Sequence, residues 1–302
     1  MVIVKLKDQL GNQMFAYASV KAMAEKKGYS FGFYRIPLDE KYINNTDKKY
    51  GSDLSTIFHL PEQEWQRDMP KQYFEYKEQP MAIRRKGDYP QRVFSELMDN
   101  CVADGHFISV KYFEDCFDKV RTWFNIPEDI LRVSQQNVNK CSINGKRKIC
   151  SVHFRVGHDY AKLGYRLSYK YWEAAAENVL KKYNDVQFVC LYDKKTEAVS
   201  RFIKKYNALE QHGSLIEDMA FISLCDVCIV SNSTFSIMSA ILNKKAEYIV
   251  RPQKYPTQVG YMPDDVFPDS WIALGNGKRD VFSACCYRIC VVIRGIKEVL
   301  GV

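Results

Sequence analysis

The sequence lacks the patterns that would assign it at once to several common classes. The stretch from Leu6 to Met14, where a first βα turn is expected, contains no G-x-G-x-x-G motif, which argues against an NAD-dependent enzyme. No run of apolar residues is long enough to span a bilayer. The basic residues form neither an arginine-rich run nor a recognition-helix pattern, so no nucleic-acid partner is predicted.

Metal-binding patterns are missing as well. Among the 10 cysteines, Cys225-x-x-Cys228 has neither a second C-x-x-C nor a well-spaced histidine partner. The two cysteines of this motif lie in or beside apolar runs, as do Cys150 and Cys190. A free cysteine in such a run behaves as a small hydrophobe. We therefore expect no metal, no cofactor and a reducing cytoplasmic location. A strand is predicted to begin at Val2, so we expect no signal peptide.

The composition indicates a globular protein with an anionic partner. With 302 residues the chain is long enough for two domains of ordinary size. A hydrophobic content of 46% allows a sizeable core in each half. Lys and Arg number 44 against 36 Asp and Glu, and the resulting net charge of +8 favours nucleotides or phospholipid surfaces as partners.

A βαβ unit is predicted at the start of the chain. Gly11 ends a short polar loop, Asn12 is a good helix N-cap, and Gly28 is a helix stop. A loop of this kind that leads into a helix N-terminus can bind an anion, although glycine and asparagine also occur in βα turns without a ligand. In the first half we predict strands at 2–6, 30–34 and 105–109, helices at 13–27, 113–124 and 130–138, irregular structure with short helices at 37–100, and a linker at 139–148.

Strands and helices alternate clearly in the second half. We predict strands at 148–153, 186–192, 227–230 and 247–250, and helices at 169–183, 196–206, 218–224 and 235–242. Such alternation predicts a parallel sheet with helices on both faces. The whole chain is therefore predicted to be an α/β protein with two Rossmann-like domains, 1–145 and 146–276, that face a cleft.

The segment 277–302 is predicted to be a separate amphipathic helix. Apolar residues recur in it at helical spacing, and basic residues lie nearby. One interpretation is a basic helix that rests on a membrane surface. The other is a terminal helix that packs across the two domains.

The strand at 148–153 leads into a cluster of charged residues, with Arg155 followed by Gly157, His158 and Asp159. Open α/β folds bind their ligands at the carboxyl ends of their strands. An arginine there can hold a phosphate with two parallel charge-assisted hydrogen bonds, which a lysine cannot do with the same geometry. The alternative is a structural ion pair between Arg155 and Asp159.

Three more polar clusters are predicted at the same edge of the sheet. Asp193 closes the strand at 186–192, Glu217 and Asp218 open a helix, and S-N-S-T-F-S at 231–236 leads from a strand into a helix. Small hydroxyl and amide side chains at a helix N-terminus can hold a phosphate, or they can serve only as helix caps. Four such clusters at one sheet edge favour a phosphate-bearing ligand, such as a nucleotide.

Taken together, the motifs resemble the alpha-1,2-fucosyltransferase family, glycosyltransferase family 11. The similar segments are L-G-N-Q-M-F-A-Y-A at 10–18, G-H-F-I-S-V-K-Y-F at 105–113, S-V-H-F-R-V-G at 151–157, L-S-Y-K-Y-W at 167–172, E-D-M-A-F-I-S-L-C-D at 217–226 and S-N-S-T-F-S at 231–236. Their order and spacing agree with the family to about Ala273.

The resemblance implies a GT-B fold and an inverting, metal-independent transfer of L-fucose. The implied donor is GDP-β-L-fucose, and the implied acceptor is the 2-hydroxyl of a galactoside on an oligosaccharide or a lipid-linked glycan. It also implies that Arg155 binds the diphosphate and stabilises charge on the departing GDP, and that Asp193 lies near the guanine. The predicted substrate-binding residues are Gly11, Asn12, Gln13, His158, Asp193, Glu217, Asp218, Asn232, Ser233, Thr234, Phe235 and Ser236.

The chain departs from the family pattern at one turn. The family motif is H-x-R-x-G-D-Y, but here His158 stands between Gly157 and Asp159, so either one residue is inserted or His158 takes the place of the aspartate. His153, His158 and Asp159 are the candidate general bases, although an SN1-like transition state needs little base assistance. A different nucleotide-sugar donor, a different linkage or a binding protein with impaired catalysis are the alternative interpretations.

Overall fold

The computed structural model describes residues 1–35, 54–78, 89–142, 147–257, 260–261 and 264–276. The predicted helix at 277–302 and the predicted domain boundary between 145 and 146 lie outside the described residues. Within those ranges, no helix combines the length and the apolar character that crossing a membrane requires.

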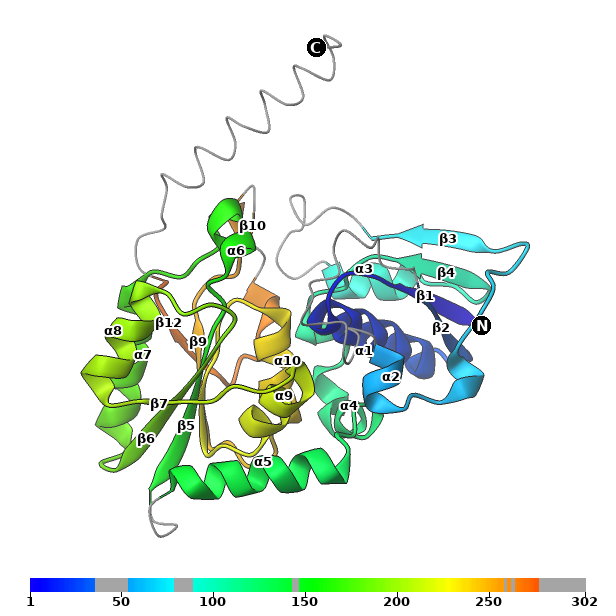
Figure 1. The fold of residues 1–302 in the computed structure, drawn as a ribbon. Helices are drawn as coiled ribbons and strands as arrows, with labels where there is room; N and C mark the ends of the chain where they lie inside the picture. Colours follow the sequence, from blue (N-terminus) through cyan, green and yellow to red (C-terminus); the bar gives the residue numbers. More distant parts are fainter. Residues whose placement is uncertain (36–53, 79–88, 143–146, 258–259, 262–263, 277–302) are drawn as a thin grey trace, which may run out of the picture.

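A parallel sheet forms the centre of the first lobe. In the described part of this lobe the strand order is β2-β1-β4-β3 (Figure 1). The strands are β1 (Val2–Leu6), β2 (Phe31–Arg35), β3 (Phe74–Lys77) and β4 (Cys101–Asp104). Helix α1 (Leu10–Lys26) connects β1 to β2 and packs against β1, so the predicted βαβ start is confirmed.

The start of α1 differs from the prediction. The helix begins at Leu10 after an extended Gln9, so Gly11 and Asn12 lie in its first turn and not in a loop or at the N-cap. Gly11 was expected to end the loop before the helix, but it lies within the helix, where its role is in packing, as described below. At the other end, Gly28 has a φ of 69° and follows the helix C-cap, as predicted.

Strands β3 and β4 also differ from the predicted pattern. The strand expected at 105–109 is found at Cys101–Asp104, because Phe107 has a left-handed φ of 48° that extended backbone cannot accommodate. β3 lies in the stretch predicted to be irregular. Its residues Phe74-Glu75-Tyr76-Lys77 do alternate, but the run is only four residues long and only Tyr76 is buried, so the sequence gives a weak signal for this edge strand.

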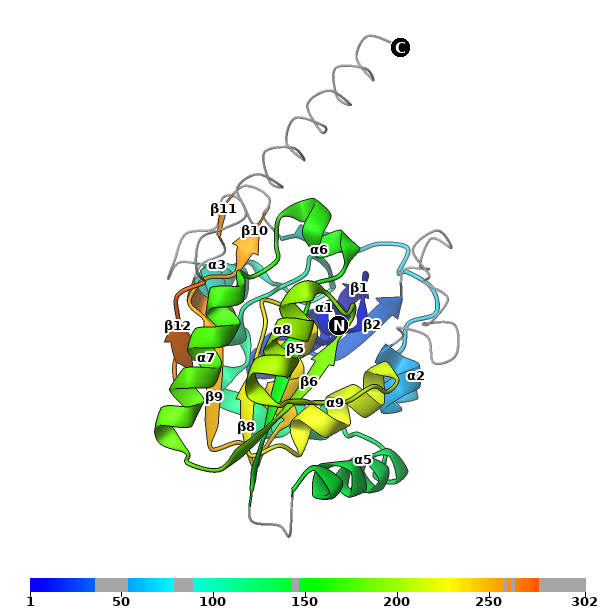
Figure 2. The same ribbon diagram turned by 60° about the vertical axis from the view of Figure 1, so that its left-hand side comes forward.

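A second parallel sheet forms the other lobe, with the strand order β12-β9-β8-β5-β6-β7 in the residues that the structure describes. Its strands are β5 (Lys148–Phe154), β6 (Val186–Tyr192), β7 (Leu209–Glu210), β8 (Val227–Ile229), β9 (Tyr248–Pro252) and β12 (Ile272–Leu274). Its main helices are α7 (Tyr169–Lys182), α8 (Glu197–Tyr206), α9 (Leu215–Ser223) and α10 (Thr234–Leu242). Figures 1 and 2 show α7 and α8 on one face and α9 and α10 on the other, so the predicted alternation is confirmed.

The remaining elements connect or flank the two sheets. They are α2 (Leu54–Phe58), α3 (Tyr89–Glu96), α4 (Phe117–Trp123), α5 (Glu128–Cys141), α6 (His158–Leu163), the hairpin β10 (Pro256–Thr257) and β11 (Gly260–Tyr261), and short 3-10 turns at Glu62–Glu64, Val110–Tyr112, Glu114–Cys116 and Asp264–Val266. α5 continues into the first residues of the predicted linker and packs against α9 of the second lobe.

Apolar side chains bury both faces of the second sheet. Along β5, Cys150, Val152 and Phe154 belong to the cluster formed with α7 and α8, whereas Ile149 belongs to the opposite cluster. Burial on both faces explains why these strands are near-continuous apolar runs in the sequence. The opposite cluster includes α9 and α10 and continues through α1 into the first lobe. The two lobes therefore share one core.

Candidate active site

Arg155 lies at the carboxyl end of β5, where side chains from both lobes surround it. Its guanidinium forms ion pairs with Asp193, which follows β6, and with Asp159 of α6 at 2.5 Å. A third contact, at 3.3 Å, is to the side-chain oxygen of Gln9 in the first lobe. The Tyr160 ring lies below the guanidinium, with its centroid 4.8 Å away. The structural ion pair considered above is therefore present, at a position suited to ligand binding.

The charge on Arg155 is maintained by its neighbours. Burial alone would lower the pKa of the guanidinium, but Tyr160, Asp193 and Asp159 more than offset that effect, so the pKa is raised. Arg155 is thus a cation at every physiological pH, held beside two carboxylates. A diphosphate that reached the guanidinium would compete with those carboxylates for its N–H groups.

Asp193 is fixed by the loop that follows β5. Its carboxylate accepts hydrogen bonds from the backbone N–H groups of Val156 at 2.8 Å and Gly157 at 2.9 Å. A Cβ on Gly157 would lie 2.5 Å from an Asp193 oxygen, so this close approach requires glycine. These contacts place Asp193 against Arg155, and a role beside the guanine stays a prediction.

The N-termini of α1 and α10 meet between the two lobes. A Cβ on Gly11 would lie 2.3 Å from the backbone nitrogen of Phe235, so only glycine allows the helices to pack this closely. Beside it, the side-chain oxygen of Asn12 accepts a hydrogen bond of 2.8 Å from the Thr234 hydroxyl. The positive ends of both helix dipoles therefore lie at this junction. Gln13 is buried, and its amide bonds the Asp8 carbonyl and the Leu54 N–H.

The S-N-S-T-F-S loop is held by contacts within the second lobe. The Ser236 hydroxyl accepts a hydrogen bond from the Ser231 N–H at 3.1 Å, which closes the loop. Asn232 is fully buried: its amide donates to the Tyr165 carbonyl, and its own carbonyl accepts from the Tyr160 hydroxyl. Its side-chain oxygen has no hydrogen-bond partner within the described ranges. Ser233, at the N-cap of α10, makes no side-chain capping bond.

The two histidines of the motif have different surroundings. His153 is buried, with Nδ1 at 3.3 Å from the Ser231 hydroxyl and its ring 5.3 Å from that of Phe235. Burial lowers the pKa of His153 to about 4, so it is a weak base. His158 is exposed at the first residue of α6. The departure from the family motif leaves Asp159 four residues after Arg155, where it forms the ion pair described above.

Glu217 and Asp218 lie near the start of α9. The Glu217 carboxylate accepts hydrogen bonds from the N–H and hydroxyl of Ser214 in a capping box, so its contacts are those of a helix cap. Burial and the neighbouring Glu217 raise the pKa of Asp218 to about 8. One of its carboxylate oxygens is buried without a hydrogen bond inside the described part of the chain. Substrate binding by either residue stays a prediction.

The sequence did not reveal a histidine–carboxylate pair on the first lobe. Nε2 of His106, in the loop after β4, contacts the carboxylate of Asp8, in the loop after β1. This contact lowers the pKa of Asp8. Asp8 directly precedes Gln9, which contacts Arg155 across the lobes. The left-handed φ of 64° at Asp8 is unusual for a residue other than glycine, but a sequence alone does not show it.

Comparison with known proteins identifies the family. A family model described as glycosyl transferase family 11 matches residues 83–275, which is more than half of the chain. The chain belongs to glycosyltransferase family 11. The resemblance found in the motifs is thereby confirmed. A curated relative of this family-11 chain is the O-antigen biosynthesis glycosyltransferase WbnK of Escherichia coli, 24% identical over 308 aligned residues that cover 88% of this chain and 97% of WbnK.

The solved structures with a similar fold include fucosyltransferases. The fucosyltransferase NodZ from Bradyrhizobium has a TM-score of 0.52 at 13% identity, with 82% of this chain and 94% of NodZ covered. POFUT1 in complex with GDP-fucose has a TM-score of 0.50 at 10% identity, with 83% and 96% covered. The predicted GT-B fold is confirmed.

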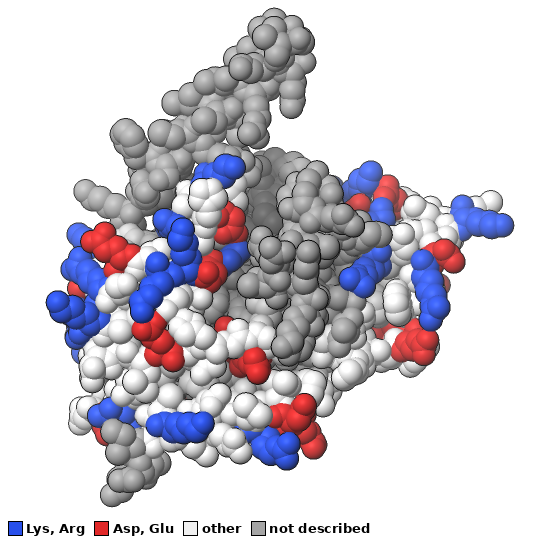
Figure 3. All heavy atoms as spheres, viewed as in Figure 1, with Lys and Arg blue, Asp and Glu red and all other residues white. Residues whose placement is uncertain are grey.

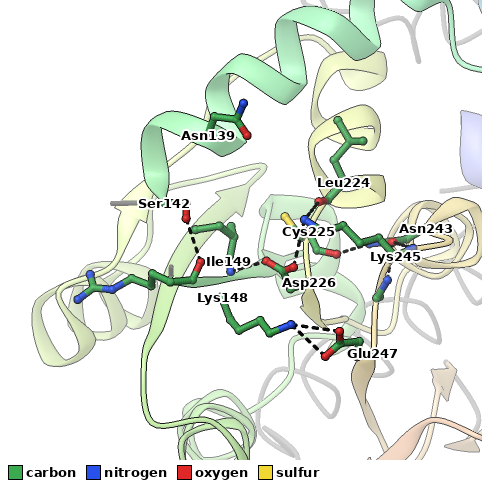
Figure 4. Close-up of polar contacts among 12 residues, drawn as sticks. Asn139, Ser142, Lys148, Ile149, Leu224, Cys225, Asp226, Asn243, Lys245 and Glu247 are labelled. Atoms are coloured by element: carbon green, nitrogen blue, oxygen red, sulfur yellow. Dashed lines mark hydrogen bonds and ion pairs between the residues drawn. The ribbon is translucent and has the colours of Figure 1, made fainter. Parts of the chain in front are cut away.

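A cavity of about 490 Å³ lies at the other end of the second sheet, away from this family-11 site. Its charged groups already have partners: Arg147 bonds Asp185 at 2.6 Å, and in Figure 4 Lys148 bonds Glu247 at 3.1 Å and Asp226 bonds the Ile149 N–H and Lys245. This cavity presents no convergent set of free donors. Figure 3 shows acidic and basic side chains intermixed on the face in view, so the described part of that face has no continuous basic surface. Among the described residues no three potential metal ligands gather, and metal independence stays a prediction.

Proposed function

We propose that the protein transfers L-fucose from GDP-β-L-fucose, with inversion, to the 2-hydroxyl of a terminal galactoside. The observation that carries the proposal is the junction of Arg155 with the N-termini of α1 and α10. These groups supply a half-buried positive charge and the positive ends of two helix dipoles between the lobes. GDP leaves with negative charge on its phosphates, and such preorganised donors stabilise that charge as it develops.

The comparisons support a nucleotide-sugar donor of this kind. The crystal structures of similar fold include POFUT1 with GDP-fucose and NodZ, an alpha-1,6-fucosyltransferase, with GDP. The WbnK relative acts in O-antigen biosynthesis, which favours a lipid-linked glycan or a soluble oligosaccharide ending in galactose as the acceptor. With these acceptors the enzyme would work at the cytoplasmic side of a membrane. It would need no metal, since Arg155 and the two helix N-termini would stabilise the charge on GDP.

The decisive experiment measures GDP release from a panel of nucleotide sugars. Lactose and N-acetyllactosamine serve as acceptors, in buffer with EDTA and again with Mg²⁺, and the linkage of the product is assigned by NMR. Acceptor-dependent release from GDP-fucose with an α-1,2 product is the expected result. Release from another donor, or a different linkage, would contradict the specificity and retain the enzyme class. GDP-fucose binding without any release would favour a binding protein with impaired catalysis.

A further inference from the structure

The direction of an inverting displacement locates the base that the transfer needs. The acceptor hydroxyl attacks the anomeric carbon from the face opposite the leaving diphosphate. In the proposed function, which this inference rests on, the diphosphate lies against Arg155 of the second lobe. His153, His158 and Asp159 belong to the same lobe as that arginine. The base is therefore expected on the first lobe.

His106 and Asp8 occupy that opposite wall. Each follows a strand of the first sheet at its carboxyl end, and β1 and β4 are neighbours in the sheet. Figure 1 shows the arrowheads of β3 and β4 directed toward the second lobe. Asp8 is joined to Gln9, whose side chain contacts Arg155 at 3.3 Å. Asp8, one member of the pair, is thus next in sequence to the residue whose side chain links the lobes.

The loop that carries His106 is held in one conformation. The Glu78 carboxylate accepts hydrogen bonds from the backbone N–H groups of His106 at 2.7 Å and Phe107 at 3.0 Å. A Cβ on Gly105 would lie 2.3 Å from the Glu78 side chain, so the approach requires glycine. Asp8 itself and Phe107, the residue after His106, both have left-handed backbone. Unfavourable backbone of this kind persists where the surrounding structure enforces it, often at functional sites.

The contact with Asp8 determines which nitrogen of His106 can act. When Nε2 carries the proton and donates to the carboxylate, Nδ1 has a lone pair and is basic. None of the described residues makes a hydrogen bond with Nδ1 of His106. The side chain is 30% exposed, which leaves it accessible to an acceptor.

We propose that His106 is the general base of the transfer and that Asp8 is its positioning residue. The acceptor oxygen forms a bond to the anomeric carbon as its proton passes to Nδ1. The bond from that carbon to the phosphate oxygen breaks, and GDP leaves with the electron pair. Asp8 holds the tautomer and stabilises the imidazolium, which then releases its proton to solvent.

The test compares a sugar acceptor with azide, an anionic nucleophile that needs no base. In H106Q the amide nitrogen can still donate to Asp8, but no basic nitrogen remains. We expect H106Q to lose about 10²- to 10⁴-fold in kcat with the sugar acceptor. GDP binding and azide-dependent GDP release should stay at the wild-type level. The matched control is H59Q, which changes an exposed histidine of the same lobe and should keep full activity.

A second variant separates a catalytic role from a structural one. D8N should lower kcat with the sugar acceptor by a smaller factor and should also preserve the azide reaction and GDP affinity. Equal loss of the sugar and azide reactions in H106Q and D8N would overturn the assignment, as would sugar transfer by H106Q within about threefold of wild type. A wild-type protein that released no GDP with either nucleophile would overturn the proposed function itself, and this inference with it.

Discussion

If the donor diphosphate binds Arg155 as proposed, it must compete with Asp159, so we expect the removal of Asp159 to tighten nucleotide binding. The guanidinium is held by Asp193, which is 21% exposed, and by Asp159, which is 49% exposed. Asp193 also accepts two backbone hydrogen bonds, whereas Asp159 lies in the first turn of the short helix α6. A bound diphosphate therefore displaces Asp159 first. The perturbation that isolates this step is Asp159→Asn, which removes the charge and retains the shape.

The size of the effect follows from the exposure of the pair. A partly exposed ion pair contributes about 0.5–1 kcal/mol, and repulsion between the same carboxylate and a diphosphate adds about as much. Relief of both, about 1–2 kcal/mol in sum, corresponds to GDP binding that is about 5- to 30-fold tighter, since 1.4 kcal/mol is tenfold. The increase should shrink at high salt, because screening weakens interactions between exposed charges.

Isothermal titration calorimetry with GDP measures this directly. The control is Asp118→Asn, which breaks an exposed ion pair with Arg121 in α4, near the opposite end of α10 from the site. D118N should bind GDP like the wild type. Unchanged or weaker GDP binding in D159N, with D118N normal, would refute the competition and would indicate that Asp159 assists the donor.

Three further predictions concern charge, packing and protonation. Arg155→Ala should lower the turnover of GDP-fucose by about 10²-fold or more; near-normal kcat in a steady-state assay would contradict its role. Gly11→Ala should destabilise the protein by about 1–3 kcal/mol in urea unfolding, because its Cβ meets the α10 backbone, whereas Gly275→Ala, where nothing lies within 4 Å, should have no such effect. The pKa of Asp218 is raised to about 8 in the folded protein, whereas in the unfolded chain it has the ordinary value of about 4. Because the folded state holds this proton more tightly, its contribution to the free energy of unfolding decreases as the pH rises from about 4 to 8. Asp218→Asn should remove that part of the slope in unfolding free energies measured between pH 5 and 8, and an unaltered slope would contradict the raised pKa.

The second lobe was predictable because its strands are buried on both faces. Apolar runs such as 186–192 stand out from their polar flanks, and the helices between them show a clear periodicity. In the first lobe the same reasoning failed where packing, and not local preference, decides the structure. Gly11 lies inside a helix at the point where α10 packs against it, and β3 is a four-residue edge strand in which only Tyr76 is buried.

The candidate site was predictable only in part, for a related reason. Arg155 and the residues after β5 stand out because charged side chains follow an apolar strand within a few positions. The ion pair with Asp193 and the contact between Asp8 and His106 join residues that are far apart in the sequence. No local pattern marks such pairs, since they come together only when the sheets form.

The core that the two lobes share has a thermodynamic consequence. Unfolding either sheet alone would expose the apolar faces of α1 and α10 that now cover each other. The lobes should therefore melt together, in one calorimetric transition whose van't Hoff and calorimetric enthalpies agree. We therefore expect the two lobes to form one cooperative unit, and neither lobe to be stable when expressed by itself.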